Sequence, residues 1–263
     1  MNPLRVSLLQ TDIAWEDKQE NLRRLRAKLE TLRGQTDVAV LPETFSTGFS
    51  MNPAALAEPA DGDTLTTLRR WAAEYGMVLA GSYIACDTPV TQVFHNRAFF
   101  LTPEGETRFY DKRHLFRMGH ETDCYTPGKE RLVVHYQGWN ICLLVCYDLR
   151  FPVWSRNRHN EYDLVIYVAN WPASRRKAWD ILLQARALEN ISYVCGVNRI
   201  GEDFHGILHD GGSAAWSPKG ERLAYVPDHT EGIATVTLDG DALQHFRKKF
   251  PAWKDADDFS IIK

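Results

Sequence analysis

Short, largely apolar runs bounded by turn residues recur along the chain and predict buried strands. They cover residues 4–10, 38–41, 77–83, 96–101, 141–145, 164–169, 193–198 and 232–238. Between several of them, apolar side chains recur at spacings of three and four, a pattern that predicts amphipathic helices. These helices cover residues 21–34, 64–75 and 178–192, and Gly34 is the expected terminator of the first. The interleaving of strands and helices favours a layered α/β fold over an all-β sandwich.

Two similar turns, TPEGE at 102–106 and SPKGE at 217–221, each join a pair of short predicted strands. Their equivalent settings indicate two internally related halves, each a sheet with helices on one face. Coincidence is the alternative, because a turn with Pro and Gly is common. No linker rich in Ser or Gly interrupts the chain, so we expect one domain over residues 1–263. Residues 240–263 predict a C-terminal helix and an aromatic tail that packs on the body or on a partner subunit.

The composition is that of an ordinary globular protein, with 44% hydrophobic and 25% charged residues. A net charge of −3 argues against broad binding to nucleic acid or to a membrane surface, which needs a basic field. The N-terminal residues show no secretory signal, and no segment reaches the roughly 20 apolar residues of a spanning helix. The five cysteines are odd in number and widely scattered, so we expect no disulfide framework and a cytoplasmic location. No pattern assigns a role to three of them, Cys86, Cys124 and Cys195.

Three predicted strands, at 38–41, 109–110 and 141–145, are followed within two residues by a reactive side chain, namely Glu43, Lys112 and Cys146. If these strands belong to one sheet and end at one edge, the three side chains meet there. The alternatives are a core cysteine, because free cysteine is among the most buried residue types, and a solvated ion pair of Glu43 and Lys112.

The chemistry of such a trio is coherent for acyl transfer. An unperturbed thiol has a pKa of about 8.5, so it needs help at neutral pH, and a nearby ammonium stabilises the thiolate. A carboxylate can take the thiol proton as a general base. The ammonium and the backbone N–H of Tyr147, directly after Cys146, can hold the oxyanion of a tetrahedral intermediate. The carboxylic acid then protonates the leaving amine and later activates water.

Five sequence blocks resemble signature blocks of the nitrilase superfamily, the carbon-nitrogen hydrolases, and the resemblance runs over nearly the whole chain. They are LPE at 41–43, YDKRHLF at 110–116, CYDLRFP at 146–152, ANWP at 169–172 and ARALEN at 185–190. Within the superfamily the chain most resembles bacterial omega-amidases, particularly over residues 112–118, 153–157 and 250–253.

The resemblance implies a role for each residue of the trio. Glu43 matches the general base of the family, Lys112 its oxyanion-stabilising lysine and Cys146 its nucleophile. Glu121 matches a second glutamate that would orient the lysine or the substrate amide. The implied fold is a four-layer αββα sandwich, assembled into homodimers or larger homo-oligomers, with neither a metal nor an organic cofactor.

The resemblance also implies a small substrate with a carboxylate at one end and a carboxamide at the other, such as 2-oxoglutaramate or 2-oxosuccinamate. Such a substrate needs a cation opposite the thiol, and Arg175 in the run 175–177 is the candidate, although three charges in a row are more often a solvated face. Phe45, Phe116 and Trp171 are candidate walls of the pocket, with core packing as the alternative for each.

Other functions remain open on these residues. The same site would suit a nitrilase, an N-carbamoyl hydrolase or a deaminated-glutathione amidase, and an inactive binding protein could keep the same fold. Residues 120–124 (HETDC) are similar to a zinc-binding HExxH motif, which requires a helix, whereas residues 122–128 predict a loop. We expect Asp148 and Arg150 to brace the turn after Cys146. We expect Arg186 to brace the structure through a carboxylate partner, with substrate contact as the alternative.

Overall fold

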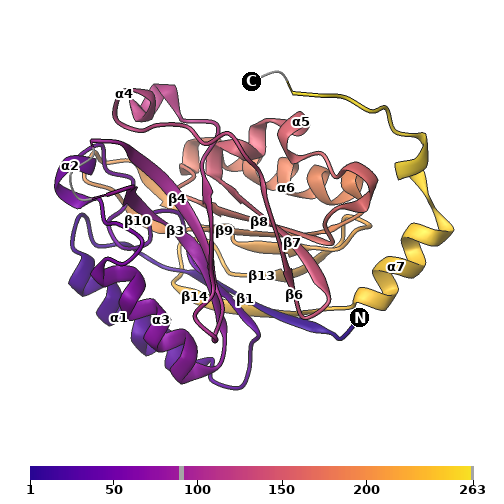
Figure 1. Cartoon of the computed structure of the whole chain (residues 1–263), viewed down its shortest axis with the longest axis horizontal. Helices are drawn as coiled ribbons and strands as arrows, with labels where there is room; N and C mark the ends of the chain where they lie inside the picture. The colour runs from indigo at the N-terminus through magenta and orange to yellow at the C-terminus, as the bar shows by residue number, and fades with distance from the viewer. Residues whose placement is uncertain (89–91, 262–263) are drawn as a thin grey trace.

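Two six-stranded sheets form the centre of the computed structural model, which describes residues 1–88 and 92–261 (Figure 1). The first sheet has the order β14-β1-β2-β3-β4-β5. Its strands are β1 (Leu4–Gln10), β2 (Val38–Val40), β3 (Val78–Cys86), β4 (Phe94–Leu101), β5 (Thr107–Asp111) and β14 (Gly232–Leu238). The second has the order β13-β12-β9-β8-β7-β6. Its strands are β6 (Leu132–Tyr136), β7 (Trp139–Val145), β8 (Leu164–Ala169), β9 (Tyr193–Asn198), β12 (Ala214–Trp216) and β13 (Arg222–Tyr225).

The two sheets repeat one pairing pattern. Starting from β14 in one sheet and β6 in the other, successive pairs are antiparallel, parallel, parallel, antiparallel and antiparallel. The turns at 102–106 and 217–221 join β4 to β5 and β12 to β13, which are equivalent hairpins in this pattern. The predicted internal relation of the two halves is therefore confirmed. The halves differ at one strand, because β14 reaches the first sheet from near the C-terminus.

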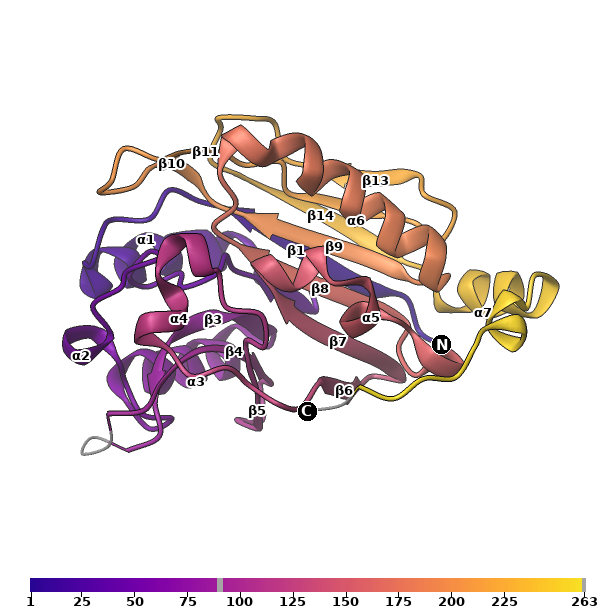
Figure 2. The ribbon, with the colours of Figure 1, turned by 90° about the horizontal axis from the view of Figure 1, so that it is seen from above.

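Helices cover the outer faces of both sheets, so the chain has the predicted four layers. Helices α1 (Lys18–Thr31) and α3 (Asp63–Tyr75) lie against the first sheet, and α6 (Arg176–Asn190) lies against the second on the opposite side of the molecule (Figure 2). Each helix that the structure describes is too short or too polar to cross a bilayer.

The central strands are continuous apolar runs in the sequence because their side chains point alternately to two faces that are both buried. In β1, Leu4, Val6 and Leu8 belong to the core between the two sheets, whereas Leu9 faces the other side, where Leu29 of α1 packs. Successive side chains of a strand point to opposite faces, and here both faces are covered by apolar layers.

The boundaries of α1 differ from the prediction at both ends. The helix begins at Lys18 because the Asp17 carboxylate caps it, accepting a hydrogen bond from the N–H of Glu20 at 3.0 Å. It ends at Thr31, so Gly34 lies beyond the helix.

Several short elements were not predicted, because one turn of helix or three to five residues of strand leave little readable period. They are α2 (Pro53–Leu56), α4 (Glu121–Cys124), α5 (Pro152–Ser155), β6, β10 (Ile200–Glu202), β11 (Leu208–Asp210), and 3₁₀ helices at Arg117–Gly119, Cys146–Arg150, Arg158–Asn160, Ala173–Arg175 and Ala252–Asp255. The expected loop at 122–128 is wrong for its first residues, which belong to α4. His120 is exposed and Glu121 fully buried, so these two neighbours point to different environments.

The C-terminal helix is α7 (Gly240–Lys249), and it lies at the end of the sandwich beside the N-terminus (Figure 1). Its buried Arg247 donates to the Asp163 carboxylate at 2.6 Å and to the Tyr162 carbonyl at 2.7 Å. Beyond the helix, the carbonyl of Phe259 accepts from Arg158 at 3.1 Å, so the tail contacts the body of its own chain. The last two residues of the predicted tail, 262–263, lie outside the described residues.

Candidate active site

The three reactive side chains meet at one place, but they come from two sheets. Glu43 follows β2, and Lys112 follows β5, both in the first sheet; Cys146 follows β7 in the second. The expectation of a single sheet edge is therefore wrong. Because the sheets pack face to face, strand ends of both open on the same side of the sandwich, and that common side brings the trio together.

Lys112 is the centre of a buried ionic cluster. Its Nζ lies 2.8 Å from Glu43 Oε1 and 2.9 Å from Glu121 Oε2, and the side chains of all three residues are fully buried. Asn96 on β4 connects the two carboxylates, because its Nδ2 donates to Glu43 Oε1 at 2.8 Å and to Glu121 Oε1 at 3.0 Å. Asn96 was not among the predicted site residues, although it is a polar residue at the start of a run that predicts a buried strand.

Asn170, directly after β8, holds the other side of Glu43. Its backbone N–H donates to Glu43 Oε2 at 2.7 Å, and its side-chain Nδ2 donates to the Glu43 carbonyl at 2.7 Å. Glu43 is therefore fixed between the ammonium of Lys112 and the end of a strand of the second sheet.

Cys146 lies at a sharp turn with a strained backbone. Its φ of 45° lies in the left-handed region, which residues with a Cβ rarely adopt. Asp148 braces the turn as expected, since it accepts from the Val145 N–H at 3.0 Å and from the Tyr110 hydroxyl at 2.7 Å. Arg186 of α6 also braces it, donating to the Leu149 carbonyl at 2.7 Å. Tyr147 lies in the first turn of the 3₁₀ helix, where N–H groups have no intrahelical acceptor.

The charges of the cluster set the protonation states of its members. Burial would raise the pKa of Glu43, but the Lys112 ammonium and hydrogen bonds from Lys112, Asn170 and Asn96 together lower it below its ordinary value. Burial would lower the pKa of Lys112, yet the carboxylates of Glu121 and Glu43 raise it above its ordinary value. Lys112 is thus an ammonium and Glu43 a carboxylate at neutral pH.

The thiol does not follow the expected trend. Burial, followed by the negative charge of Glu43, raises the pKa of Cys146 well above its ordinary value, and the ammonium of Lys112 only partly opposes this. Lys112 is already shared by two carboxylates, so its charge is not free to stabilise a thiolate. In the resting protein Cys146 is a neutral thiol, whose Sγ lies 3.9 Å from the Asn170 carbonyl oxygen.

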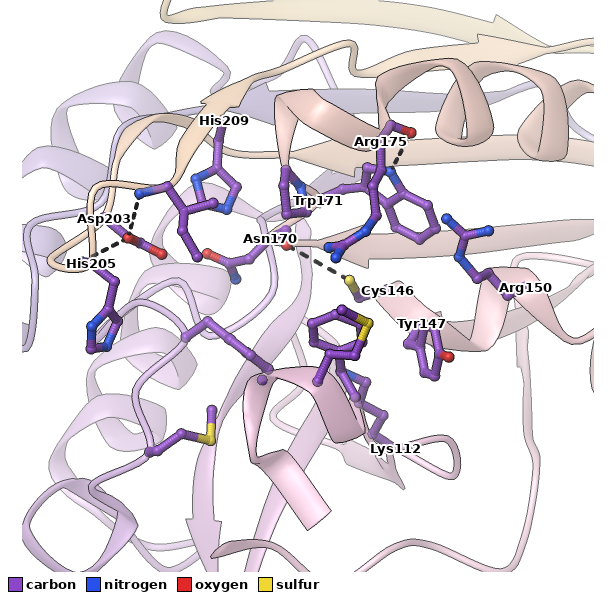
Figure 3. Close-up of a pocket in the computed structure, with 17 residues that line it drawn as sticks. Lys112, Cys146, Tyr147, Arg150, Asn170, Trp171, Arg175, Asp203, His205 and His209 are labelled. Carbon is purple, nitrogen blue, oxygen red and sulfur yellow. Dashed lines mark hydrogen bonds between the residues drawn. The ribbon is translucent and has the colours of Figure 1, made fainter. Parts of the chain in front are cut away.

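A cavity of about 200 Å³ opens over this cluster, with Lys112, Cys146 and Tyr147 in its wall (Figure 3). This is below the roughly 300–1,000 Å³ of sites for drug-sized ligands and suits a small molecule. Of the predicted lining residues, Phe116, Trp171 and Arg175 line it. Phe45 does not: it is buried in the core under the first sheet, where its ring meets Phe99 edge-on with centroids 6.0 Å apart.

Two guanidinium groups reach the cavity, from Arg150 and Arg175 (Figure 3). Arg150 lies over the Trp171 ring and Arg175 over the Phe116 ring, each with its Cζ 5.1 Å from the centroid. Among the described residues neither guanidinium forms an ion pair. The Arg150 side chain lines the cavity, so the expectation that it braces the turn is wrong. Arg176, the next residue of the basic run, points elsewhere and pairs with Asp180, Asp210 and Asp228.

A further part of the cavity lining was not predicted. Asp203, His205, Ile207 and His209, from the hairpin of β10 and β11, line the cavity. Figure 3 shows Asp203, His205 and His209 on the side away from the guanidinium groups. Short strands and a polar turn carry no pattern that would connect them to Cys146.

Comparison with known proteins agrees with this geometry. Residues 5–248 match the family described as carbon-nitrogen hydrolase. The chain belongs to this family. It is 45% identical to omega-amidase YafV of Escherichia coli K12 over 261 residues, which cover 99% of this chain and 100% of that protein. It is 30% identical to 2-oxoglutaramate amidase of Bacillus subtilis, over 95% of this chain and 96% of that one.

A solved structure extends the likeness to three dimensions. It is a carbon-nitrogen hydrolase superfamily protein from Xanthomonas campestris with an arsenic adduct in its active site, and it aligns with a TM-score of 0.95 and 41% identity. The alignment covers 99% of this chain and 100% of that one. The chain is thus a hydrolase of carbon-nitrogen bonds with the nitrilase fold, in the amidase class.

Proposed function

We propose that the protein is an omega-amidase, which hydrolyses the terminal carboxamide of small 2-oxo dicarboxylate monoamides to the dicarboxylate and ammonia. The observation that carries this proposal is the position of Cys146 in one small cavity. The buried Glu43–Lys112–Glu121 cluster lies on one side of it, and on another lie two guanidinium groups that form no ion pair with any residue in 1–88 or 92–261. A thiol and a buried acid–base pair suit attack on the amide, and guanidinium groups suit a carboxylate at the far end of the substrate. The names of the relatives, omega-amidase and 2-oxoglutaramate amidase, support the same substrate class.

The first half of the reaction forms a thioester. Glu43 takes the proton of the Cys146 thiol as the sulfur attacks the amide carbon, and the carbonyl electrons move to the oxygen. The Lys112 ammonium and the backbone N–H of Tyr147 hold that oxyanion. When the oxyanion collapses, the carbon–nitrogen bond breaks, and the nitrogen takes the proton from Glu43 and leaves as ammonia.

The second half returns the enzyme to its starting state. Glu43, again a carboxylate, takes a proton from a water molecule that attacks the thioester carbon. The carbon–sulfur bond then breaks, the dicarboxylate leaves, and the sulfur recovers a proton from Glu43. In this scheme Glu121 touches no reacting atom; its bonds to Lys112 hold the ammonium in place.

Arg150 and Arg175 are our candidates for holding the substrate carboxylate. A guanidinium matches a carboxylate through paired N–H donors, and both groups lack a carboxylate partner among the described residues. Phe116 and Trp171, on which they lie, would keep the two cations in position.

We also propose a homodimer or larger homo-oligomer working in the cytoplasm. Ile181 and Leu188 on the outer face of α6 are 53% and 49% exposed, which supports a contact between copies. Five unpaired cysteines suit a reducing compartment. Light scattering coupled to size-exclusion chromatography measures the assembly directly, and a monomer at micromolar concentration would contradict this part.

The deciding experiment measures ammonia release from 2-oxoglutaramate, 2-oxosuccinamate, a nitrile, an N-carbamoyl amino acid and deaminated glutathione, with intact-mass spectrometry of the quenched enzyme. We expect the 2-oxo monoamides to have the highest kcat/KM and to leave an acyl adduct on wild-type protein but not on Cys146→Ala. A higher kcat/KM for the nitrile, the N-carbamoyl amino acid or deaminated glutathione would show that the proposed substrate class is wrong. An equal adduct on Cys146→Ala would remove Cys146 as the nucleophile.

A further inference from the structure

Two buried polar atoms in the wall of the catalytic cavity have no hydrogen-bond partner among the described residues. They are Oδ1 of Asn170 and Nδ1 of His209. Both side chains line the cavity, and their residues are only 7% and 3% exposed. Asn170 follows β8 and His209 lies on β11, and Figure 3 shows both side chains in the same part of the cavity. Because a buried polar atom without a partner costs free energy, two in one cavity indicate a ligand that pairs with them.

The orientation of the Asn170 amide follows from its neighbours. Nδ2 lies 2.7 Å from the backbone carbonyl of Glu43, which can only accept, and 3.1 Å from the Thr44 hydroxyl. A flipped amide would place oxygen against oxygen at that carbonyl. Oδ1 is therefore the atom left free, and it is an acceptor that needs an N–H or O–H donor.

His209 adds a second acceptor. Burial and the neighbouring charge of Arg199 lower the pKa of His209 to about 4, so its imidazole is neutral at physiological pH. A neutral imidazole has one unprotonated nitrogen, which accepts, and one N–H; we assign the proton to Nε2, so that Nδ1, the atom without a partner among the described residues, is the acceptor. The two residues together thus present two acceptor atoms to the cavity.

Hydrogen-bond donors and acceptors lie in different parts of the cavity wall. Lys112 and the Tyr147 N–H can only donate, so they suit the carbonyl oxygen of an amide. Glu43, which protonates the leaving nitrogen in the proposed mechanism, accepts from the Asn170 N–H at 2.7 Å and therefore lies on the Asn170 side. The nitrogen of a bound carboxamide thus belongs where the free acceptors are.

We propose that Asn170 Oδ1 and the unprotonated nitrogen of His209 accept the two N–H groups of the substrate's primary carboxamide. This subsite selects primary amides over N-substituted amides and over esters of the same acyl group, because an N-methyl amide has one N–H and an ester has none. The inference rests on the proposed amidase function and assigns to these two residues the recognition of the leaving nitrogen.

The test compares two His209 variants of similar side-chain volume. His209→Gln keeps an acceptor, and His209→Leu removes it. Asn170 is not substituted, because its Nδ2 also supports Glu43. For each protein, kcat/KM is measured for 2-oxoglutaramate and for the methyl ester with the same acyl group, and the amide-to-ester ratio is calculated. His135→Leu, at an exposed position of β6 outside the cavity, is the control for loss of an imidazole.

We expect His209→Leu to lower the amide-to-ester ratio by about tenfold to a hundredfold, the usual effect of leaving a buried polar group unpaired. His209→Gln should recover most of that loss, and His135→Leu should match wild type. If His209 had only a structural role, His209→Leu would lower kcat/KM for both substrates equally and leave the amide-to-ester ratio unchanged. That result would overturn the proposal.

A second measurement needs only the wild-type protein. It should hydrolyse the N-methyl amide at least about tenfold more slowly than the primary amide, and equal rates would overturn the proposal even if neither variant folds. A different result would refute the proposed function itself, namely hydrolysis of the primary amide by Cys146→Ala at the wild-type rate. Hydrolysis through Cys146 with an unchanged ratio in His209→Leu refutes the subsite alone.

Discussion

At the scale of single residues, the proposed chemistry depends on the proton of Cys146. The buried thiol is neutral at rest, and the carboxylate of Glu43 beside it is charged, because Lys112 lowers the pKa of one group while burial raises that of the other. In the proposed mechanism, attack by the sulfur therefore has to be accompanied by proton transfer to Glu43. Cys146 therefore differs from cysteines that are already thiolates at rest because a free cation lies beside them.

Substitution of the base tests this coupling. Glu43→Gln keeps the shape of the side chain but cannot accept the thiol proton, so we expect kcat to fall by about 10²–10⁴-fold. Alkylation of Cys146 by iodoacetamide should slow as well, because the thiol keeps its proton. Stopped assays of ammonia release and mass spectrometry of the alkylated protein measure the two effects. Normal turnover by Glu43→Gln would exclude it as the base.

The pH profile follows from the sign of the Glu43 shift. Because the pKa of Glu43 is lowered from 4.5, the base stays charged as the pH falls to that value. We expect titration of Glu43 to lower kcat/KM only below about pH 4.5. A loss that begins above this pH is assigned to Glu121, whose pKa is raised by burial, and should disappear in Glu121→Gln. Lys112→Met removes the main group that lowers this pKa, so the acidic limb of its residual activity should move to higher pH. Circular dichroism at each pH separates titration from unfolding.

At the scale of elements, the turn after β7 depends on groups supplied by other strands. The Tyr110 hydroxyl at the end of β5 donates to Asp148 at 2.7 Å and accepts from Trp154 Nε1 at 2.9 Å. It therefore connects the first sheet to the turn that carries Cys146.

Removal of that hydroxyl should weaken the turn. Tyr110→Phe leaves one Asp148 oxygen and the Trp154 N–H short of a partner, so we expect a loss of about 1–3 kcal/mol in the free energy of unfolding and a lower kcat. Urea denaturation and steady-state assays measure both. Tyr136→Phe, whose hydroxyl accepts from Gln137 at 3.0 Å in an exposed setting, is the matched control and should change little.

The predicted elements show where periodicity is informative. Strands β8, β9 and β14 match their predicted ranges, and α3 differs by one residue, because long apolar runs and helical stripes are local properties. The start of α1 was missed because a cap at Asp17, which comes before the apolar stripe, sets it. The hairpin of β10 and β11 was missed because its strands are three residues long.

At the scale of the whole molecule, the C-terminal part of the chain completes the first half. Strand β14 pairs with β1 over its full length, and α7 then returns to the second sheet through the Arg247–Asp163 ion pair. We propose that the chain is accordingly one domain, whose two halves unfold together. A single calorimetric transition is the expected result, and two separated transitions would contradict it.

The ion pair gives this idea a quantitative test. Arg247→Leu leaves the buried Asp163 carboxylate without its cation, so we expect a loss of about 3–5 kcal/mol in the free energy of unfolding. Lys248→Leu, exposed on the same helix, should stay within about 0.5 kcal/mol of wild type. Chemical denaturation followed by tryptophan fluorescence measures both variants. A loss below about 1 kcal/mol for Arg247→Leu would show that α7 adds little to the fold.

Local sequence patterns were enough to predict the layered α/β class, the paired hairpins and the three side chains proposed to react, because apolar periodicity and the residues that follow each strand lie within a few positions of one another. The tertiary structure alone decided that the trio comes from two sheets, that Asn96 and Asn170 hold Glu43, and that Phe45 packs in the core. It also decided the charge states, because the pKa of Cys146 depends on the burial of the thiol and on carboxylates far away in the sequence. Burial and electrostatic contact arise only when distant segments pack together, so no local pattern contains them.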